Sequence, residues 1–249
     1  MKKIFALLVA IAMVFALAAC GCNATDPTDA SAPTDASAPT EAASEAQAVM
    51  TCAEYMAAEM ESEVSVETFV QAHQSWWDNK ITVYCQSEDG AYLLYELACS
   101  EEDAEKLVPG TKIRVNGYKS EWSGEVEIID GTFEFVNDGE TYVAEALDVT
   151  ELLGTEELIN HQNKFASFKG LTVENISYKN DEPGDDIYLT LGYNGASYDF
   201  CVEVYLTGTE SEVYTTVGTL KAGDKVDVEG FLYWYEGVNP HITAITVVE

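Results

Sequence analysis

Basic residues are scarce in this chain. Against 44 aspartates and glutamates stand 12 lysines and arginines, the formal net charge is −32, and Arg114 is the only arginine. Phosphate backbones and anionic lipid head groups are recognised largely through clustered lysine and arginine. The sequence therefore predicts no nucleic-acid partner and an acidic surface that keeps the protein soluble.

Motifs of common catalytic and metal centres are also missing. The chain has no G-x-S-x-G or H-E-x-x-H segment and no glycine-rich phosphate loop, and His73, His161 and His241 stand alone. These absences predict no catalytic residue, no metal site, no cofactor, and a protein that is not an enzyme. One alternative stays open, because two carboxylates that are close only in space could cleave glycan at the cell surface without leaving a motif.

A long apolar run occurs only at the start of the chain. Lys2 and Lys3 precede an uncharged run, Ile4 to Ala19, and Leu17-Ala18-Ala19 leads into Cys20. This segment resembles the signal peptide and lipobox of bacterial lipoproteins. The resemblance implies a signal peptide over 1–19, acylation of Cys20 by fatty acids such as palmitate, and a location on the outer face of the cell membrane. An uncleaved transmembrane anchor is the alternative, but the run is shorter than the ~20 residues that span a bilayer.

The segment 20–50 has the composition of a tether. Between 23 and 48 it holds only Ala, Ser, Thr, Pro, Asp, Glu, Gln and Asn, so it cannot bury enough apolar surface to offset its chain entropy. We expect this segment to be disordered.

Segment 51–137 is predicted to be the first folded domain. Thr51 and Glu54 form a possible capping box before a short helix through Met60. Strand-like runs follow at 64–72, 81–86 and 91–99, then a short helix after Ser100, then strands at 112–119 and 125–136. A three-residue loop at 88–90 would pair Cys85 with Leu93, Val83 with Tyr95 and Ile81 with Leu97, whereas a two-residue loop would place Glu96 opposite Val83.

Four cysteines fall in the folded part: Cys52, Cys85, Cys99 and Cys201. They form no C-x-x-C pair and lack zinc-finger spacing. In the three-residue register Cys99 lies opposite Asn79, about 20 Å along the strand from Cys85. We therefore expect no bond between Cys85 and Cys99, and the pairing of the four otherwise stays open.

Segment 164–249 repeats the order of strands. An Asn194-Gly195 turn would pair Leu191 with Tyr198, Leu189 with Phe200 and Ile187 with Val202. Aligning 107–136 with 220–249 without gaps matches these positions: Leu107/Leu220, Gly110/Gly223, Lys112/Lys225, Val115/Val228, Gly117/Gly230, Gly124/Gly237 and Ile129/Ile242. A duplicated domain follows, with 138–163 as a connector that holds a short helix from Thr155.

Five strands with a helix between the third and fourth resemble the OB-fold, a small Greek-key barrel. The stretch 107–118 resembles the entry to strand four of bacterial OB-fold proteins. Together with the leader, this pattern is similar to uncharacterised tandem-OB lipoproteins of Gram-positive anaerobes. The resemblance implies a mainly β chain of two five-stranded barrels and says little about chemistry.

Tryptophans mark the candidate ligand site. OB-folds bind ligands around strands two and three, between the loops that join strands 1–2 and 4–5. In the first repeat these loops carry the predicted ligand-binding residues: Trp76, Trp77, Asp78, Asn79, Glu121 and Trp122. Rings beside polar groups suit stacking on a ligand, although a ring could instead cap the barrel.

An acidic loop lies in the second repeat. Asp181, Glu182, Asp185 and Asp186 crowd together, but they lack the order of an EF-hand. A solvated turn is the preferred interpretation and calcium binding stays open. The sequence as a whole predicts a membrane-anchored, non-enzymatic protein that binds an extracellular glycan, peptide or envelope protein.

Overall fold

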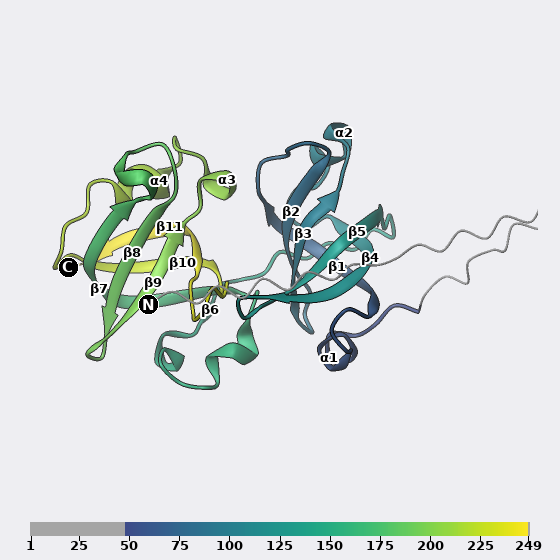
Figure 1. The fold of residues 1–249 in the computed structure, drawn as a ribbon, viewed down its shortest axis with the longest axis horizontal. Coiled ribbons are helices and arrows are strands. Elements are labelled where there is room, and N and C mark those ends of the chain that lie inside the picture. Colours follow the sequence, from purple (N-terminus) through teal and green to yellow (C-terminus); the bar gives the residue numbers. More distant parts are fainter. Residues whose placement is uncertain (1–47, 249) are drawn as a thin grey trace, which may run out of the picture. The chain divides into compact units, whose positions relative to one another are not determined.

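A computed structural model describes residues 48–248, and this part of the chain is mainly β, as predicted. Its first half is a closed barrel of five strands in the order β1-β2-β3-β5-β4, with β1 pairing β4 to close the ring (Figure 1). The strands are β1 (Glu63–His73), β2 (Lys80–Gln86), β3 (Ala91–Ala98), β4 (Lys112–Trp122) and β5 (Glu125–Phe135). This is the five-stranded Greek-key barrel of the OB-fold.

The second half repeats this order of strands. Its strands are β7 (Phe165–Tyr178), β8 (Ile187–Tyr193), β9 (Ala196–Val202), β10 (Lys225–Phe231) and β11 (His241–Val248). They pair as β7-β8-β9-β11-β10, and pairing of β10 with β7 closes this ring too. A short strand, β6 (Leu147–Asp148), runs parallel beside β7. The prediction of two OB-like barrels is confirmed.

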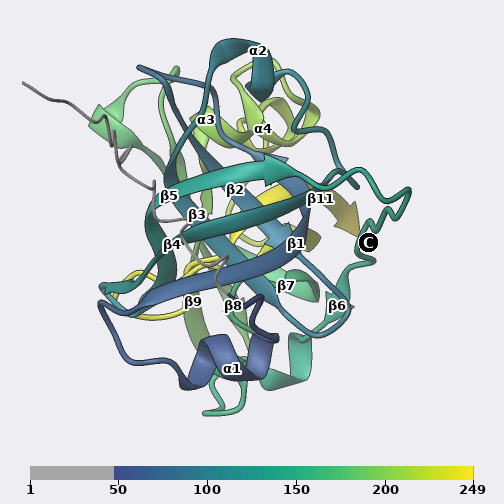
Figure 2. The same cartoon turned by 90° about the vertical axis from the view of Figure 1, so that its right-hand side faces the viewer.

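Short helices connect and cover the strands. The α-helices are α1 (Cys52–Ala57), α2 (Glu101–Ala104), α3 (Val204–Thr207) and α4 (Glu212–Val217), and the 3-10 turns are η1 (Thr150–Leu152), η2 (Leu158–His161) and η3 (Lys179–Asp181). Each barrel has helix between its third and fourth strands, α2 in the first and α3 with α4 in the second. Figure 2 shows α1 and α2 at opposite ends of the first barrel. Within 48–248, no helix is long and apolar enough to cross a membrane.

Capping residues start the helices of the first half. The Thr51 side chain and the Glu54 carboxylate form the expected capping box on α1, and Ser100 caps α2. Helix α1 ends at Ala57 rather than Met60, because Ala58 already has extended backbone angles.

The β2–β3 hairpin differs from the predicted register. Ile81 faces Leu97 as expected, but nearer the turn Val83 faces Leu94 and Cys85 faces Tyr92. A bulge at Tyr95 and Glu96 takes up the extra residue. A single uniform register was therefore the wrong assumption for this hairpin.

The second hairpin and the repeat agree with the sequence. Leu191 faces Tyr198 and Ile187 faces Val202, across an Asn194-Gly195 turn whose two φ angles are positive. The aligned glycines Gly117 and Gly230 share a physical reason, because a Cβ at either position would overlap the backbone of the paired strand.

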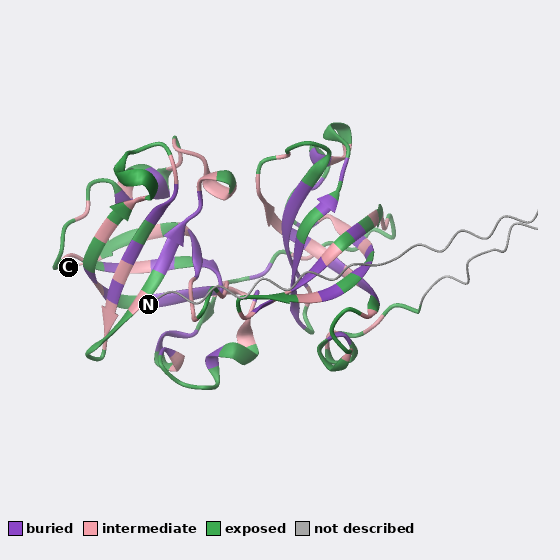
Figure 3. Cartoon of the chain, viewed as in Figure 1, coloured by how far each residue is buried: buried purple, intermediate pink, exposed green. Residues whose placement is uncertain are grey.

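Each barrel has its own core. Figure 3 shows buried positions along the strands of both barrels. The first core includes Val64, Val83, Leu94 and Ile113, and the second includes Phe168, Leu171, Leu189 and Phe200. The four described cysteines are free thiols, of which Cys85, Cys99 and Cys201 are buried.

A third cluster joins the two barrels, which belong to one unit of the chain, 45–249. Tyr84 and Leu93 from the first barrel pack with Phe231 from the second, and the rings of Tyr84 and Phe231 stack at 4.5 Å. The Gln86 side chain also accepts a hydrogen bond from the Phe165 backbone N–H at 2.7 Å. Aromatic packing and this polar contact fix the second barrel against β2 and β3.

Candidate functional site

Large aromatic rings are exposed on one face of the first barrel. Trp77 is 79% exposed, Trp122 54% and Tyr95 44%. Trp77 lies in the β1–β2 loop, Trp122 ends β4, and Tyr95 lies on β3. The barrel thus brings together rings from loops that are about forty-five residues apart in sequence, on the face where OB-folds take ligands.

These rings border two adjoining hollows. The Trp77 hollow, of about 430 Å³, is lined by Trp76, Trp77 and Thr82 on the first barrel and by Tyr205 from α3 of the second. The Trp122 hollow, of about 640 Å³, is lined by residues that include Asp78, Asn79, Glu121 and Trp122.

Both hollows are lined by Lys80, Tyr95 and Glu96, so they adjoin along these residues. We call the two hollows together the aromatic cleft. Each hollow has a volume within the roughly 300–1,000 Å³ range of small-molecule sites.

A rigid turn holds Trp77 at the edge of the cleft. The Trp77 N–H donates to the Lys80 carbonyl at 3.0 Å, and the Lys80 N–H donates to the Trp77 carbonyl at 2.9 Å. Between them Asp78 and Asn79 have φ angles of 47° and 60°, the left-handed pair that a tight hairpin turn needs. Aspartate and asparagine tolerate this conformation better than most residues, which explains their presence here.

Two further residues that line the cleft have strained backbone angles. Glu96 and Asp130 both have left-handed φ angles, 47° and 49°, although neither is glycine. Each lies at an irregularity of strand pairing, Glu96 between β2 and β3 and Asp130 between β4 and β5, and each lines the Trp122 hollow. Such strain persists where the surrounding structure imposes it, and it is frequent at binding sites.

Trp76 and Trp77 have different environments. Trp76 is half-buried, packs against the first core, and donates its indole N–H to the Cys99 carbonyl at 2.9 Å. Only part of its surface lines the Trp77 hollow. Trp76 therefore anchors the loop, whereas Trp77 offers a free ring face.

The β4–β5 turn that carries Trp122 is braced by the second barrel. The Trp122 ring lies 5.2 Å from that of Tyr235, and the Glu236 N–H donates to the Ser123 carbonyl at 2.7 Å. The Trp234 backbone N–H donates to Glu125 Oε2 at 2.8 Å, and Glu125 is fully buried. Burial raises the pKa of the Glu125 carboxyl to about 8.

The cleft is acidic. Five carboxylates line the Trp122 hollow: Asp78, Glu96, Glu121, Glu127 and Asp130. Lys80 is the only basic residue that lines it, and its ammonium pairs with Glu96 at 2.5 Å. A positively charged ligand group is favoured here by simple electrostatics.

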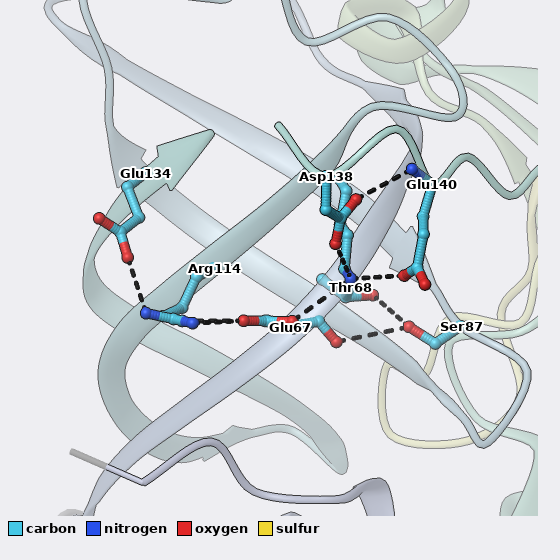
Figure 4. Close-up of polar contacts among 8 residues, drawn as sticks. Glu67, Thr68, Ser87, Arg114, Glu134, Asp138 and Glu140 are labelled. Carbon is cyan, nitrogen blue, oxygen red and sulfur yellow. Dashed lines mark hydrogen bonds and ion pairs between the residues drawn. The ribbon is translucent and has the colours of Figure 1, made fainter. Parts of the chain in front are cut away.

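Two basic residues of β4 outside the cleft are also paired with carboxylates. Arg114 contacts Glu67 at 2.6 Å and Glu134 at 3.0 Å, and Lys112 contacts Asp138 and Glu140, each at 2.6 Å (Figure 4). These contacts place Lys112 and Arg114 of β4 within a network of carboxylates on β1, on β5 and in the segment after β5.

The acidic loop of the second barrel is held by its own contacts. Lys179 pairs with Asp186 at 3.0 Å and Asp185 at 3.4 Å. Asp186 also accepts the Val204 N–H at 2.9 Å. Within the described residues, no group of three or more histidines, cysteines or carboxylates is arranged to hold a metal ion.

Sequence reasoning missed several residues of the cleft. Tyr95, Glu96 and Asp130 reach it through bulges, which the alternation of a regular strand does not reveal. Tyr205 comes from the other barrel, and the Ser75 N–H, which donates to the Tyr205 carbonyl at 2.7 Å, brings it there. Glu127 stands in the sequence as an outward polar position between apolar neighbours, and only the structure shows that it is buried.

Comparisons with known proteins concern the whole described fold. No family model matches the chain, and no curated relative matches it. Solved structures are similar at low levels. The p204 HINb domain covers 77% of this chain and all of its own length, at 12% identity and a TM-score of 0.36.

Two further structures were solved with DNA. The Ifi202 HINa domain in complex with 20-bp double-stranded DNA covers 75% of this chain and 98% of its own, at 11% identity and a TM-score of 0.35. A Replication Protein A heterotrimer bound to single-stranded DNA covers 76% of this chain and 49% of its own, at 13% identity and a TM-score of 0.31.

These findings contradict the ligands predicted from the sequence. The predicted glycan, peptide or envelope-protein ligand and the alternative of a surface enzyme on glycan have no counterpart among these structures, of which those that name a ligand name DNA; their likeness to this chain concerns the fold. The exclusion of nucleic acid is contradicted as well. That exclusion rested on net charge. Net charge averages over the whole surface and does not describe whether bases can stack on the exposed rings of one cleft. The Cys20 anchor lies outside the described residues and stays a prediction.

Proposed function

We propose that this chain is a non-enzymatic binding protein and that its ligand is a planar organic group held in the aromatic cleft. The joined hollows and the exposed rings of Trp77, Tyr95 and Trp122 carry this proposal. Offset or edge contacts with aromatic rings contribute about 0.5–1.5 kcal/mol beyond the area they bury.

The two hollows differ in polarity, which orients the ligand. The Trp77 hollow combines rings with neutral polar groups of Gln74, Ser75 and Thr82, and its single charged pair is Lys80 with Glu96. It suits the flat part of a ligand. The Trp122 hollow carries the carboxylates and suits a part that bears hydrogen-bond donors.

The direct test is a titration with quinoline, a flat neutral heterocycle at about pH 8. The unmodified protein is expected to bind it saturably, and Trp77→Ala and Trp122→Ala are expected to weaken binding about fivefold or more. Tyr188→Ala is the matched control, because Tyr188 is an exposed ring on β8 that lines neither hollow. Equal binding by all four proteins would contradict the proposal.

Single-stranded nucleic acid is a second candidate ligand. It is favoured by the position of the exposed rings on the face where OB-folds bind oligonucleotides, since bases stack on aromatic side chains regardless of sequence. The carboxylates of the Trp122 hollow oppose phosphates. Titration with oligothymidylate at low and physiological salt decides between the candidates, because only a nucleic-acid site gives affinity that weakens as salt rises and that Trp77→Ala removes.

On the leader residues alone, we also propose that the mature chain is attached through Cys20 to the outer face of a bacterial membrane. In that location the tether 20–50 would hold the barrels away from the lipid.

A further inference from the structure

Glu127 is a buried carboxylate inside the aromatic cleft. It lies on β5 opposite Ser120 of β4, is only 6% exposed, and lines the Trp122 hollow. The other four carboxylates of this hollow, Asp78, Glu96, Glu121 and Asp130, are exposed. Glu127 therefore differs from the rest of the acidic set in being largely removed from water while still facing the hollow.

The Glu127 carboxylate has no partner. Among residues 48–248 it makes neither a hydrogen bond nor an ion pair. By contrast, Glu96 is paired with Lys80. Glu125 accepts the Trp234 backbone N–H through Oε2, and its Oε1 is fully buried without a partner, away from the hollow's lining. The Glu127 oxygens open onto the hollow and are not among the fully buried side-chain atoms that lack a partner, so solvent or a ligand in the hollow can reach them. An unpaired carboxylate that faces a hollow points to a ligand whose positive charge pairs with it.

The surroundings of Glu127 favour a ligand that carries a positive charge. The titratable groups whose pKa values respond to the Glu127 charge are Glu125 on its own strand, Tyr95 on β3, Tyr233 after β10 and Tyr55 on α1. None of these is a cation. Lys80, the only basic residue lining the hollow, is engaged by Glu96. A ligand with a positively charged nitrogen would give the Glu127 carboxylate a partner. Its charge would also offset the negative charge of the hollow.

We propose that Glu127 is the ligand-binding carboxylate of the cleft and that the ligand class is a planar organic cation. The flat ring system would lie against Trp77 and Tyr95, and the positive nitrogen would lie beside Glu127 in the Trp122 hollow. This inference rests on the proposed function and deepens it by naming the charge of the ligand and the residue that reads it. In the complex the Glu127 carboxylate gains the partner that it lacks among residues 48–248.

The same geometry makes cation binding depend on pH. Burial raises the pKa of the Glu127 carboxyl to about 7, so the group is neutral below that pH and charged above it. A permanently charged ligand is therefore expected to bind more tightly as pH rises from about 6 to about 8. Neutral ligands of the same shape should show no such change.

The test compares N-methylquinolinium, which is cationic at every pH, with neutral quinoline at about pH 8. The unmodified protein is expected to bind the cation about tenfold more tightly than quinoline, through the attraction between its charge and the carboxylate. Glu127→Gln, which keeps the shape of the side chain, should bring the two affinities within about twofold and remove the pH dependence. Glu229→Gln, an exposed site on β10 with the same charge change, should leave both affinities unchanged.

The outcomes separate this inference from the proposed function. Equal affinity of the unmodified protein for both compounds, or an unchanged preference in Glu127→Gln, would overturn the inference while leaving the aromatic cleft as a binding site. Failure of both compounds to bind the unmodified protein would overturn the proposed function together with it. A preference lost equally in Glu229→Gln would show a general effect of net charge and would also overturn the role of Glu127.

Discussion

The Tyr84 hydroxyl lies 2.7 Å from Nδ1 of His241, and both residues are buried between the two barrels. Burial lowers the pKa of His241 to about 3, so its ring is neutral near pH 7. The pair, together with the stacked ring of Phe231, connects β2 of the first barrel to the second barrel. Because β2 also begins at the cleft residue Lys80, this contact holds in place a strand that lines the cleft.

Loss of the Tyr84 hydroxyl should weaken the joined barrels. Tyr84→Phe keeps the ring but leaves His241 Nδ1 unpaired in a buried place, which costs about 1–3 kcal/mol. Urea unfolding should show this loss. Tyr205→Phe is the matched control because Tyr205 is 60% exposed, and its free energy of unfolding should not change measurably. Equal stability of Tyr84→Phe and the unmodified protein would contradict the account.

Adjacent tryptophans should respond in opposite ways to removal. Trp76→Ala deletes a ring packed on the core and its hydrogen bond to Cys99, so it is expected to cost about 3–5 kcal/mol. Trp77→Ala deletes an exposed ring and is expected to change stability by less than about 1 kcal/mol. Thermal unfolding of the two variants checks this difference. A large loss for Trp77→Ala would mean that its ring is structural and not free for a ligand.

The buried carboxylates predict how stability varies with pH. The folded-state pKa of Glu125 is about 8, above its ordinary value of 4.5, so the folded chain keeps a proton that the unfolded chain releases between these values. Stability should therefore fall as pH rises through this window, by at most about 1.4 kcal/mol per pH unit for each such group. Glu127 and Glu203, each with a pKa raised by burial to about 7, add to the slope up to that pH.

Glu125→Gln removes one of these protons. Urea unfolding at a series of pH values is expected to show a shallower fall between about pH 5 and 8 for this variant, by roughly one proton. The exposed change Glu229→Gln should leave the slope as it is. An identical slope in Glu125→Gln would show that Glu125 is ionised in the folded chain at neutral pH.

Lipid attachment is predicted to depend on Cys20. Cys20→Ala removes the thiol that would be acylated, and the tether that follows has no apolar segment to replace it. Metabolic labelling with a fatty acid in a bacterial host should label the unmodified chain and not the variant. Cys22→Ala is the matched control and should keep the label. Persistent labelling of Cys20→Ala would rule out the anchor.

The barrels could be predicted from the sequence because local signals agree with the fold. The capping box at Thr51, the Ser100 cap and the Asn194-Gly195 turn each specify a local conformation that tertiary packing keeps. The repeat also gave a reliable guide, since aligned Gly117 and Gly230 meet the same close approach of strands. Local propensity and global topology thus point to the same structure.

The cleft could be predicted only in part. Trp77 and Trp122 reach one rim because the topology of the barrel dictates it. The bulge at Glu96 could not be predicted from one uniform register. It lies where the register at the open end of the hairpin changes by one residue to the register near the turn. Burial of Glu127 and the arrival of Tyr205 depend on contacts between the barrels, which leave no periodic signal in the sequence.

The most direct measurement of the central claim is the response of the four tryptophan indole N–H signals in an NMR titration with N-methylquinolinium. The account predicts large shifts for Trp77 and Trp122, which border the aromatic cleft, and much smaller ones for Trp76, whose N–H is bonded to Cys99, and for Trp234 outside it. Single tryptophan variants assign the four signals. Shifts confined to Trp234, or no saturable shift at any tryptophan, would contradict a ligand site in the aromatic cleft.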